Sequence, residues 1–155
     1  MPNIVLVNPE IPPNTGNIAR SCAATGTELH LVEPLGFELS DRYLKRAGLD
    51  YWPHVELTVH GSLPEFYAHH ADRGGRLIGF TTRGVSSYVE IEYRQDDWLL
   101  FGSESQGLDS EVLQSCHHTV KIPMPHAKVR SLNLSVSAAI GLFESLRQLG
   151  HLSLK

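Results

Sequence analysis

The sequence of 155 residues has few cysteines and no long apolar run. Its two cysteines, Cys22 and Cys116, lack the spacing of a metal site or a redox motif, which indicates reduced thiols in a cytoplasmic protein. No apolar stretch approaches the roughly 20 residues that span a bilayer. The amino end, MPNIVLVNPEIPP, has neither the basic start nor the apolar stretch of a signal peptide. We therefore expect no membrane segment and a cytoplasmic location.

Several patterns of catalysis and of chain organisation are also missing. Ser103 and Ser105 do not meet the Gly-x-Ser-x-Gly pattern of a nucleophile elbow. Two histidine pairs occur, at 69–70 and 117–118, but adjacent side chains diverge and the sequence shows no third ligand at a useful spacing, so we expect no metal. No internal repeat, low-complexity tract or linker divides the chain. We expect one domain over residues 1–155.

The composition is that of an ordinary globular domain, with 41% hydrophobic and 19% charged residues. The net charge of −4 argues against a protein coated in basic surface. A local phosphate-binding patch remains open, and the basic residues that could supply it are Arg42, Lys45, Arg46, Arg73, Arg76, Lys121, Lys128 and Arg130.

Strand-like and helix-like segments alternate along the chain. Expected strands cover 3–8, 28–33, 55–59, 76–82, 98–103 and 118–124. Expected helices cover 17–26, 40–48, 62–71, 110–116 and 133–149. Asn14 or Thr15 would cap the first helix and Gly26 would end it, while Ser40 or Asp41 would cap the second. This alternation predicts an α/β fold with a mostly parallel sheet flanked by helices.

The last expected helix is apolar around much of its circumference. Its apolar residues cover an arc of roughly 240° when placed at about 100° each; they are Leu134, Val136, Ala138, Ala139, Ile140, Leu142, Phe143, Leu146 and Leu149. The sheet can cover one side only. A second copy of the chain is the simplest cover for the rest, which predicts a homodimer. The alternative is a helix buried within the monomer.

Three loops hold most of the Gly, Pro, Asn and Ser that simple turns do not need. They are NPEIPPNTGNIAR (8–20), GSESQG (102–107) and IPMPHAKVRSLNLS (122–135), and each follows an expected strand. Loops at the carboxyl ends of strands are where open α/β sheets bind ligands. Gly102 and Gly107 would let backbone approach a ligand, and Arg20, near a helix start, would grip phosphate or carboxylate. The alternative for the glycines is a plain strand-to-helix loop, and the alternative for Arg20 is a surface salt bridge.

Taken together and in this order, NTGNIAR, LFGSESQGL and IPM…RSLNLSVSAA resemble the three motifs of the SPOUT superfamily of RNA methyltransferases. The resemblance covers essentially the whole chain. The short length and the segments EIPPNTGNIAR, EPLGF and RAGLDY are similar to the minimal members that methylate the wobble-nucleotide ribose 2'-OH of tRNA. The resemblance implies a deep carboxyl-terminal trefoil knot, the cofactor S-adenosyl-L-methionine, and tRNA, through its anticodon stem-loop, as partner. Leu isoacceptors are the implied substrates.

The resemblance also implies roles for individual residues. The implied cofactor-binding residues are Phe80, Thr81, Gly102, Glu104, Gly107, Ile122, Met124, Ser131 and Leu132. The implied catalytic residues are Arg20, Ser131 and Asn133. The implied RNA-binding residues are Asn14, Asn17, Arg20, Arg42, Arg46, Lys128 and Arg130. No early glycine-rich loop with a following acidic residue is present, which argues against a Rossmann-type methyltransferase.

Because the sulfonium of the cofactor already activates the methyl group, the enzyme has only to place the ribose hydroxyl in line with it and help to remove the hydroxyl proton. No metal is required. Arg20 is a poor base because a guanidinium keeps its proton at neutral pH, so we expect it to orient the RNA phosphate, although proton removal by Arg20 stays open. Gln106 and Phe143 depart from the arginine and tyrosine of many relatives. A non-catalytic RNA-binding protein, a methyltransferase of another RNA and a small-molecule methyltransferase are the alternatives.

Overall fold

The computed structural model describes residues 1–42, 44, 46, 51–126 and 128–154. Within them, seven strands form one sheet in the order β3-β2-β1-β6-β4-β7-β5, and neighbouring strands run parallel. The strands are β1 (Asn3–Val7), β2 (Leu29–Val32), β3 (Leu57–His60), β4 (Leu77–Phe80), β5 (Ser86–Ser87), β6 (Trp98–Phe101) and β7 (His118–Lys121). The expected α/β fold with a parallel sheet is confirmed.

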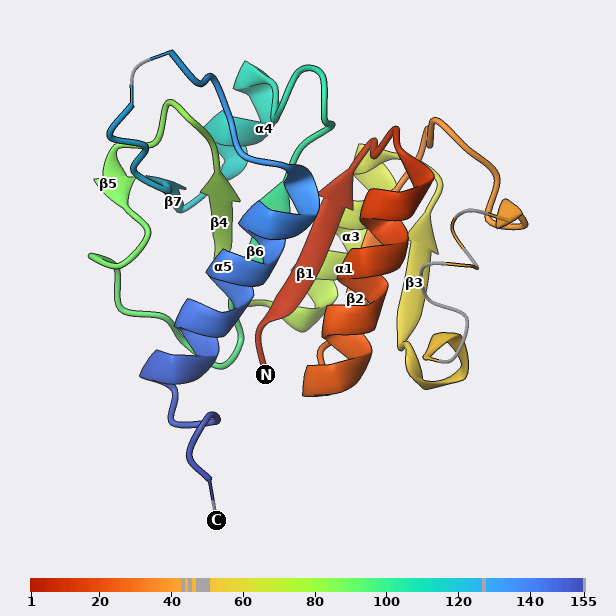
Figure 1. Ribbon diagram of the computed structural model, residues 1–155, viewed down its shortest axis with the longest axis horizontal. Helices are drawn as coiled ribbons and strands as arrows, with labels where there is room; N and C mark the ends of the chain where they lie inside the picture. Colours follow the sequence, from red (N-terminus) through yellow and green to blue (C-terminus); the bar gives the residue numbers. More distant parts are fainter. Residues whose placement is uncertain (43, 45, 47–50, 127, 155) are drawn as a thin grey trace.

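Helices lie on both faces of this sheet. They are α1 (Pro12–Thr25), α3 (Leu63–Arg73), α4 (Ser110–Ser115) and α5 (Leu134–Gln148), with a short 3-10 helix η1 (Trp52–His54). In Figure 1, α1 and α5 lie in front of the sheet and α3 and α4 behind it. The sequence did not predict η1 or β5. The expected helix at 40–48 includes residues outside the described part of the chain; within that part, the backbone N–H of Leu44 donates to Asp41 Oδ1 at 3.4 Å.

Strand β1 shows why the sheet is covered on both faces. All five of its residues are buried, and its alternate side chains enter two separate clusters. Ile4 and Leu6 pack with residues of α1 and α5, whereas Val5 and Val7 pack with Phe66 of α3 and with residues of β6. A continuous apolar strand of this kind suits a sheet with helices on both sides. Among the described residues, no helix combines the length and hydropathy needed to cross a membrane.

Helix α1 begins earlier than the sequence indicated. Its N-cap is Ile11, which provides no side-chain hydrogen bond, so the expectation that Asn14 or Thr15 caps it is wrong. Both lie inside the first turn and are buried. Its end is as expected, because Gly26 adopts φ 70° and its N–H bonds to carbonyls of the last turn.

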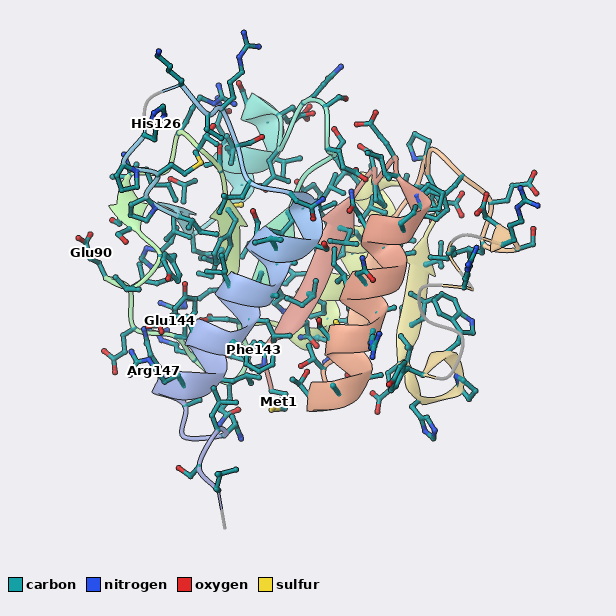
Figure 2. The ribbon with its side chains drawn as sticks, viewed as in Figure 1. Met1, Glu90, His126, Phe143, Glu144 and Arg147 are labelled. Atoms are coloured by element: carbon teal, nitrogen blue, oxygen red, sulfur yellow. The ribbon has the colours of Figure 1, made fainter. Side chains whose placement is uncertain are left out.

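Helix α5 divides its apolar arc between the monomer core and the surface. Leu142 and Leu146 are each 1% exposed and pack inside the chain. On another side of the helix, Val136 is 47% and Phe143 42% exposed, and Figure 2 labels Phe143 on this helix. Monomer burial therefore accounts for part of the arc. An apolar stripe through Val136 and Phe143 remains in contact with solvent.

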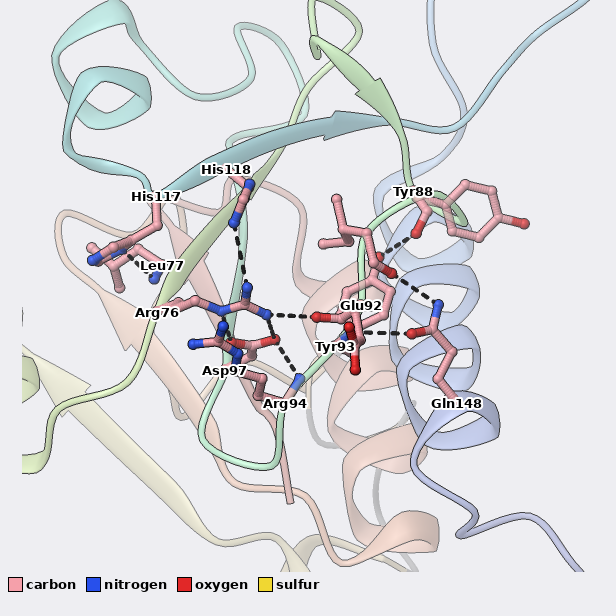
Figure 3. Close-up of polar contacts among 11 residues, drawn as sticks. Arg76, Leu77, Tyr88, Glu92, Tyr93, Arg94, Asp97, His117, His118 and Gln148 are labelled. Carbon is pink, nitrogen blue, oxygen red and sulfur yellow. Dashed lines mark hydrogen bonds and ion pairs between the residues drawn. The ribbon is translucent and has the colours of Figure 1, made fainter.

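An ion pair fastens the amino ends of β4 and β6 together. Arg76 donates from Nε and Nη2 to the two oxygens of fully buried Asp97, at 2.8 and 2.7 Å, and to the Glu92 carbonyl (Figure 3). Arg73 in turn pairs with Glu28 at 2.6 Å. Both arginines were candidates for a phosphate patch. Their engagement within the fold makes them structural residues; Lys45, another candidate, lies outside the described residues.

Candidate functional site

A cavity of about 490 Å³ opens at the edge of the sheet where β4, β6 and β7 end. Its walls come from the segments that follow these strands, 81–83, 102–108 and 130–134, together with Ile122, Met124 and the start of α1. Parallel strands carry their ligand sites at their carboxyl ends, which is where this cavity lies. Its volume is in the range of small-molecule and cofactor pockets.

The residues that the sequence assigned to a cofactor are gathered around this cavity. All nine line it, namely Phe80, Thr81, Gly102, Glu104, Gly107, Ile122, Met124, Ser131 and Leu132. Asn14, Arg130 and Asn133, assigned to RNA or catalysis, line it as well. These positions are separated by up to 119 residues in the sequence, so the fold has to bring them together.

The floor of the cavity is aromatic and apolar. The rings of Phe80 and Phe101 stack with centroids 4.6 Å apart. Gly141 of α5 lies against them, and a Cβ there would approach Phe80 Cζ to 2.7 Å, so glycine allows the helix to close over the two rings. Ile122 and Leu134 extend the apolar surface. A flat aromatic group of a ligand would pack well on such a floor.

Two carboxylates clamp the 102–107 loop to the start of α1. Glu104 accepts hydrogen bonds from the backbone N–H groups of Glu10 and Ile11, at 2.9 and 2.7 Å. In return, Glu10 accepts from Ser105 N and Oγ at 3.0 and 2.6 Å, and these bonds lower the pKa of its carboxyl. Glu104 therefore fixes the two residues that lead into α1, Glu10 and the N-cap Ile11, and its negative charge is favoured near the positive end of the helix.

Two asparagines connect Glu104 to the segment that precedes α5. Asn14 Nδ2 donates to Glu104 Oε2 at 3.2 Å, and Asn133 Nδ2 donates to Asn14 Oδ1 at 3.1 Å. Asn133 Oδ1 also accepts from the N–H groups of Ser135 and Val136, so it caps α5. In the structure, Asn14 and Asn133 hold the loops in place. Their side-chain amides are engaged with the protein.

The two glycines of the 102–107 loop have different roles. A Cβ on Gly102 would lie 2.0 Å from the carbonyl carbon of Gly107 and 2.2 Å from Leu108 N, so the space beside it is filled by the loop's own backbone. The sequence predicted that Gly102 leaves out a Cβ to make room for a ligand. This is wrong on the side where the Cβ would point, because backbone of the loop occupies that space. Gly107 adopts φ +70° with nothing within 4 Å of a Cβ, which is the left-handed turn that glycine favours.

Arg20 lies away from the cavity of its own chain. Its side chain is exposed on α1, donates from Nη2 to the Tyr51 hydroxyl at 3.2 Å, and lies over the Tyr51 ring at 4.6 Å from the centroid. Asn17, Arg42, Arg46 and Lys128 are also exposed and are not among the described residues that line the cavity. The structure therefore does not unite the expected catalytic arginine with the expected cofactor residues inside one chain.

The cavity includes polar residues that the sequence reasoning missed. Arg83 and Thr82 line it beyond β4, and Ser137 lines it from α5. The guanidinium of Arg83 donates to the Leu108 carbonyl at 3.5 Å, and Arg83 and Arg130 are both lining residues with a positive charge. For Thr82 and Arg83 the available signal was their position just after the apolar strand β4, because ligand loops begin there.

The loops therefore enclose a site for an amphipathic small molecule. The stacked Phe80 and Phe101 rings and Ile122 suit a base, and the hydroxyls and backbone groups of the 102–107 and 130–133 segments suit ribose and amino-acid polar atoms. This donor set fits a nucleoside-containing cofactor such as S-adenosyl-L-methionine.

Sequence comparison identifies the family. The SpoU rRNA methylase family matches residues 1–143. The chain belongs to this family. A SpoU relative from Synechocystis sp. is 60% identical over 149 residues, which are 96% of this chain and 97% of that protein. The tRNA (cytidine(34)-2'-O)-methyltransferase of Burkholderia ambifaria is 47% identical over 150 residues, 96% of each chain.

Solved structures of SpoU relatives share the whole fold. One, from work on 2'-OH methylation of C/U34 on tRNA, superposes with a TM-score of 0.93, is 52% identical, and covers 97% of both chains. The SpoU methyltransferase AviRb of Streptomyces viridochromogenes, in complex with AdoMet, gives a TM-score of 0.88 at 26% identity and covers 96% of this chain and 57% of that one. The expected family resemblance is confirmed.

Proposed function

We propose that the protein transfers a methyl group from S-adenosyl-L-methionine to the ribose 2'-OH of the wobble pyrimidine, nucleotide 34, of tRNA. The observation that carries this is the cavity, which gathers all nine residues expected to hold the cofactor. Similarity over nearly the whole length to a tRNA (cytidine(34)-2'-O)-methyltransferase supports the position on the RNA. By the resemblance, the substrates are Leu isoacceptors, and the protein would act in the cytoplasm.

The cofactor would be held by residues of the three loops. Phe80 and Ile122 would contact its base, while the 102–107 backbone and Ser131 would bind its polar groups. When bound, it supplies an electrophilic methyl group on a sulfonium. The protein's own contribution is to place the ribose hydroxyl in line and to exclude water, for which the Glu104–Asn14–Asn133 network holds the loops rigid.

Arg20 would bind and orient the RNA substrate and would not contact the cofactor of its own chain. A guanidinium offers a planar pair of donors to phosphate, and Tyr51 restricts its orientation. Since Arg20 is outside the cavity of its own chain, we propose that it serves the cofactor site of a partner chain. Asn17, Arg42, Arg46, Lys128 and Arg130 would contribute to the RNA surface, and Ser131 would shape the reacting site.

The first test of this proposal is cofactor binding. We expect S-adenosyl-L-methionine to bind with one site per chain and to raise the melting temperature, because a ligand that binds only the folded state stabilises it by mass action. Calorimetry and thermal unfolding measure both. Adenosine triphosphate is a matched control with the same base. No heat and no thermal shift at roughly millimolar cofactor would reject the methyltransferase assignment.

A homodimer through α1 and α5 is the second part of the proposal. The exposed apolar stripe of α5 that contains Val136 and Phe143 supports it. Within each chain α1 packs against α5, so a partner that covers this stripe would also lie close to α1. We expect Phe143→Lys to give a monomer, since a buried unpaired charge is costly at an interface. Val89→Lys is the control, because Val89 is 49% exposed in another part of the chain.

Analytical ultracentrifugation measures the oligomeric state of the wild type and the two lysine variants. Wild type and Val89→Lys should sediment as dimers at micromolar concentration, and a monomeric wild type would refute the dimer. A charge at Leu142 or Leu146 is a poor probe, because both side chains lie in the monomer core and the change would unfold the chain.

We also propose the trefoil knot of the resembled superfamily. Strand β7 pairs with β4 and β5, yet the helix that follows it packs on α1 and β6. The segment between β7 and α5 must therefore cross the end of β4 to reach its position, as Figure 1 illustrates. Such a crossing is compatible with threading of the chain end, an arrangement that general rules of chain topology disfavour.

A further inference from the structure

Three histidines from three different elements converge on the α3 side of the sheet. His30 lies in β2, His60 ends β3, and His69 lies in α3. One ring nitrogen from each lies within 4.8 Å of the other two. His30 is fully buried and His60 is 6% exposed, while His69 is partly exposed. The cluster therefore sits just below the surface, on strands that do not build the cavity.

The hydrogen bonds of His30 determine which of its nitrogens is free to coordinate. Its Nε2 lies 3.1 Å from Glu28 Oε2, and a carboxylate only accepts, so Nε2 carries the proton. Its Nδ1 therefore presents a lone pair, 3.0 Å from His60 Nε2. Arg73 Nη1 fixes the same Glu28 carboxylate at 2.6 Å. This is the carboxylate–histidine arrangement that orients metal ligands in proteins.

His69 contains a polar atom that nothing satisfies. Its Nε2 is buried without a hydrogen-bond partner; in the described part of the chain, Thr15 Oγ1 is the other side-chain atom in that condition. Buried polar atoms are rarely left unpaired. Burial also lowers the pKa of His30 to about 4 and lowers the pKa of His60. Neutral rings are the form that binds metal.

We propose that His30, His60 and His69 bind a divalent transition-metal ion, with Zn²⁺ as the best fit. Three imidazole nitrogens with a carboxylate behind one ring are a donor set that suits zinc. Nitrogen ligands in a tetrahedral zinc site lie about 3.3 Å apart, and the His30–His60 pair is already at 3.0 Å. Rotation of the His69 ring would bring in the third nitrogen.

Metal binding changes the tautomer of His60 and leaves its charge unchanged. Before binding, His60 Nε2 carries the proton that it donates to His30 Nδ1. When the ion binds between these two nitrogens, that proton is carried by Nδ1 of His60. No net proton is released, and water occupies the fourth position on the partly exposed side of His69. The sequence suggested no metal because it showed His69 only beside His70; the other two ligands come from β2 and β3.

The ion would tie α3 to the edge of the sheet formed by β2 and β3. This role is independent of the proposed methyl transfer, whose cavity is built on β4, β6 and β7. We therefore expect Zn²⁺ to raise the melting temperature and to leave the affinity for S-adenosyl-L-methionine unchanged.

The test is a titration of untagged, chelator-treated protein with Zn²⁺, and with Co²⁺ as a coloured probe. We expect one equivalent to bind, with a visible Co²⁺ spectrum of a four-coordinate nitrogen and oxygen site. Ring-nitrogen NMR shifts should be confined to His30, His60 and His69. His69→Gln should weaken binding by at least about tenfold, since loss of a residue that only supports a ligand already costs that much, whereas His54→Gln, on the exposed η1, should not.

The wild-type titration can overturn the proposal on its own. Absence of saturable one-to-one binding at roughly 100 µM metal would do so, and so would NMR shifts at other histidines. Unchanged binding by His69→Gln would also reject the site. These readouts use no activity measurement, so they remain valid whether or not the chain methylates tRNA.

Discussion

Arg20→Ala is expected to abolish methyl transfer while leaving the affinity for S-adenosyl-L-methionine nearly unchanged. The reason is the position of Arg20, which is exposed on α1, bonded to Tyr51 and outside the cavity of its own chain. Arg20→Lys is the sharper variant because it keeps the charge but loses the planar pair of donors. We expect its turnover to fall at least about a hundredfold, as for loss of a donor to the transition state.

Single-turnover kinetics with saturating cofactor measure this effect on the chemical step. Arg94→Lys is the matched control, since Arg94 is also an exposed arginine and lies in a different part of the chain. Near-normal turnover by Arg20→Lys would show that charge alone matters and that Arg20 does not position the RNA. Mixing Arg20→Ala chains with chains carrying a cofactor-site substitution should restore partial activity if Arg20 acts across a dimer.

Gly102→Ala is expected to damage the cofactor site even though it adds a single methyl group. Its Cβ would lie 2.0 Å from backbone of the same loop, so the 102–108 segment must move. We expect a loss of at least about 2 kcal/mol of stability, as for overpacking, and a cofactor affinity lower by at least about tenfold because the loop lines the cavity. Gly102→Val should be worse.

Calorimetry with S-adenosyl-L-methionine and chemical denaturation separate the two effects. Gly26→Ala is the control: it is strained by φ +70° but its Cβ would meet nothing within 4 Å. It should cost about 1 kcal/mol of stability and leave the cofactor affinity unchanged. If Gly102→Ala binds the cofactor as wild type does, the close approach of Gly102 to Gly107 is not needed for the site.

The sequence predicted those features that short segments determine. The apolar run 98–101 followed by glycine correctly placed β6 and the loop after it, which lines the cavity, and Gly26 correctly placed the end of α1. The two-residue strand β5 is too short to leave a pattern in the sequence. Family resemblance supplied nine residues for the cofactor site, and the fold brings all nine together around the cavity.

What the sequence missed depends on contacts between distant residues. The start of α1 was misplaced because its N-cap, Ile11, has no capping side chain and is held instead by Glu104, 93 residues away. The amides of Asn14 and Asn133 are engaged with each other across 119 residues, which motif reading cannot show. The histidine cluster needs β2, β3 and α3 to be packed before its three members meet. Local patterns do not encode such proximity.

The proposed methyl acceptor is the ribose 2'-OH of nucleotide 34. Purified protein, S-adenosyl-L-methionine with a labelled methyl group, and two tRNAs that differ only by a 2'-deoxy sugar at position 34 test it directly. Mass spectrometry of nuclease fragments should find one added methyl group on nucleotide 34 of the ribose form and none on the deoxy form. A methyl group at another nucleotide, on a base, or on the deoxy form would contradict the account.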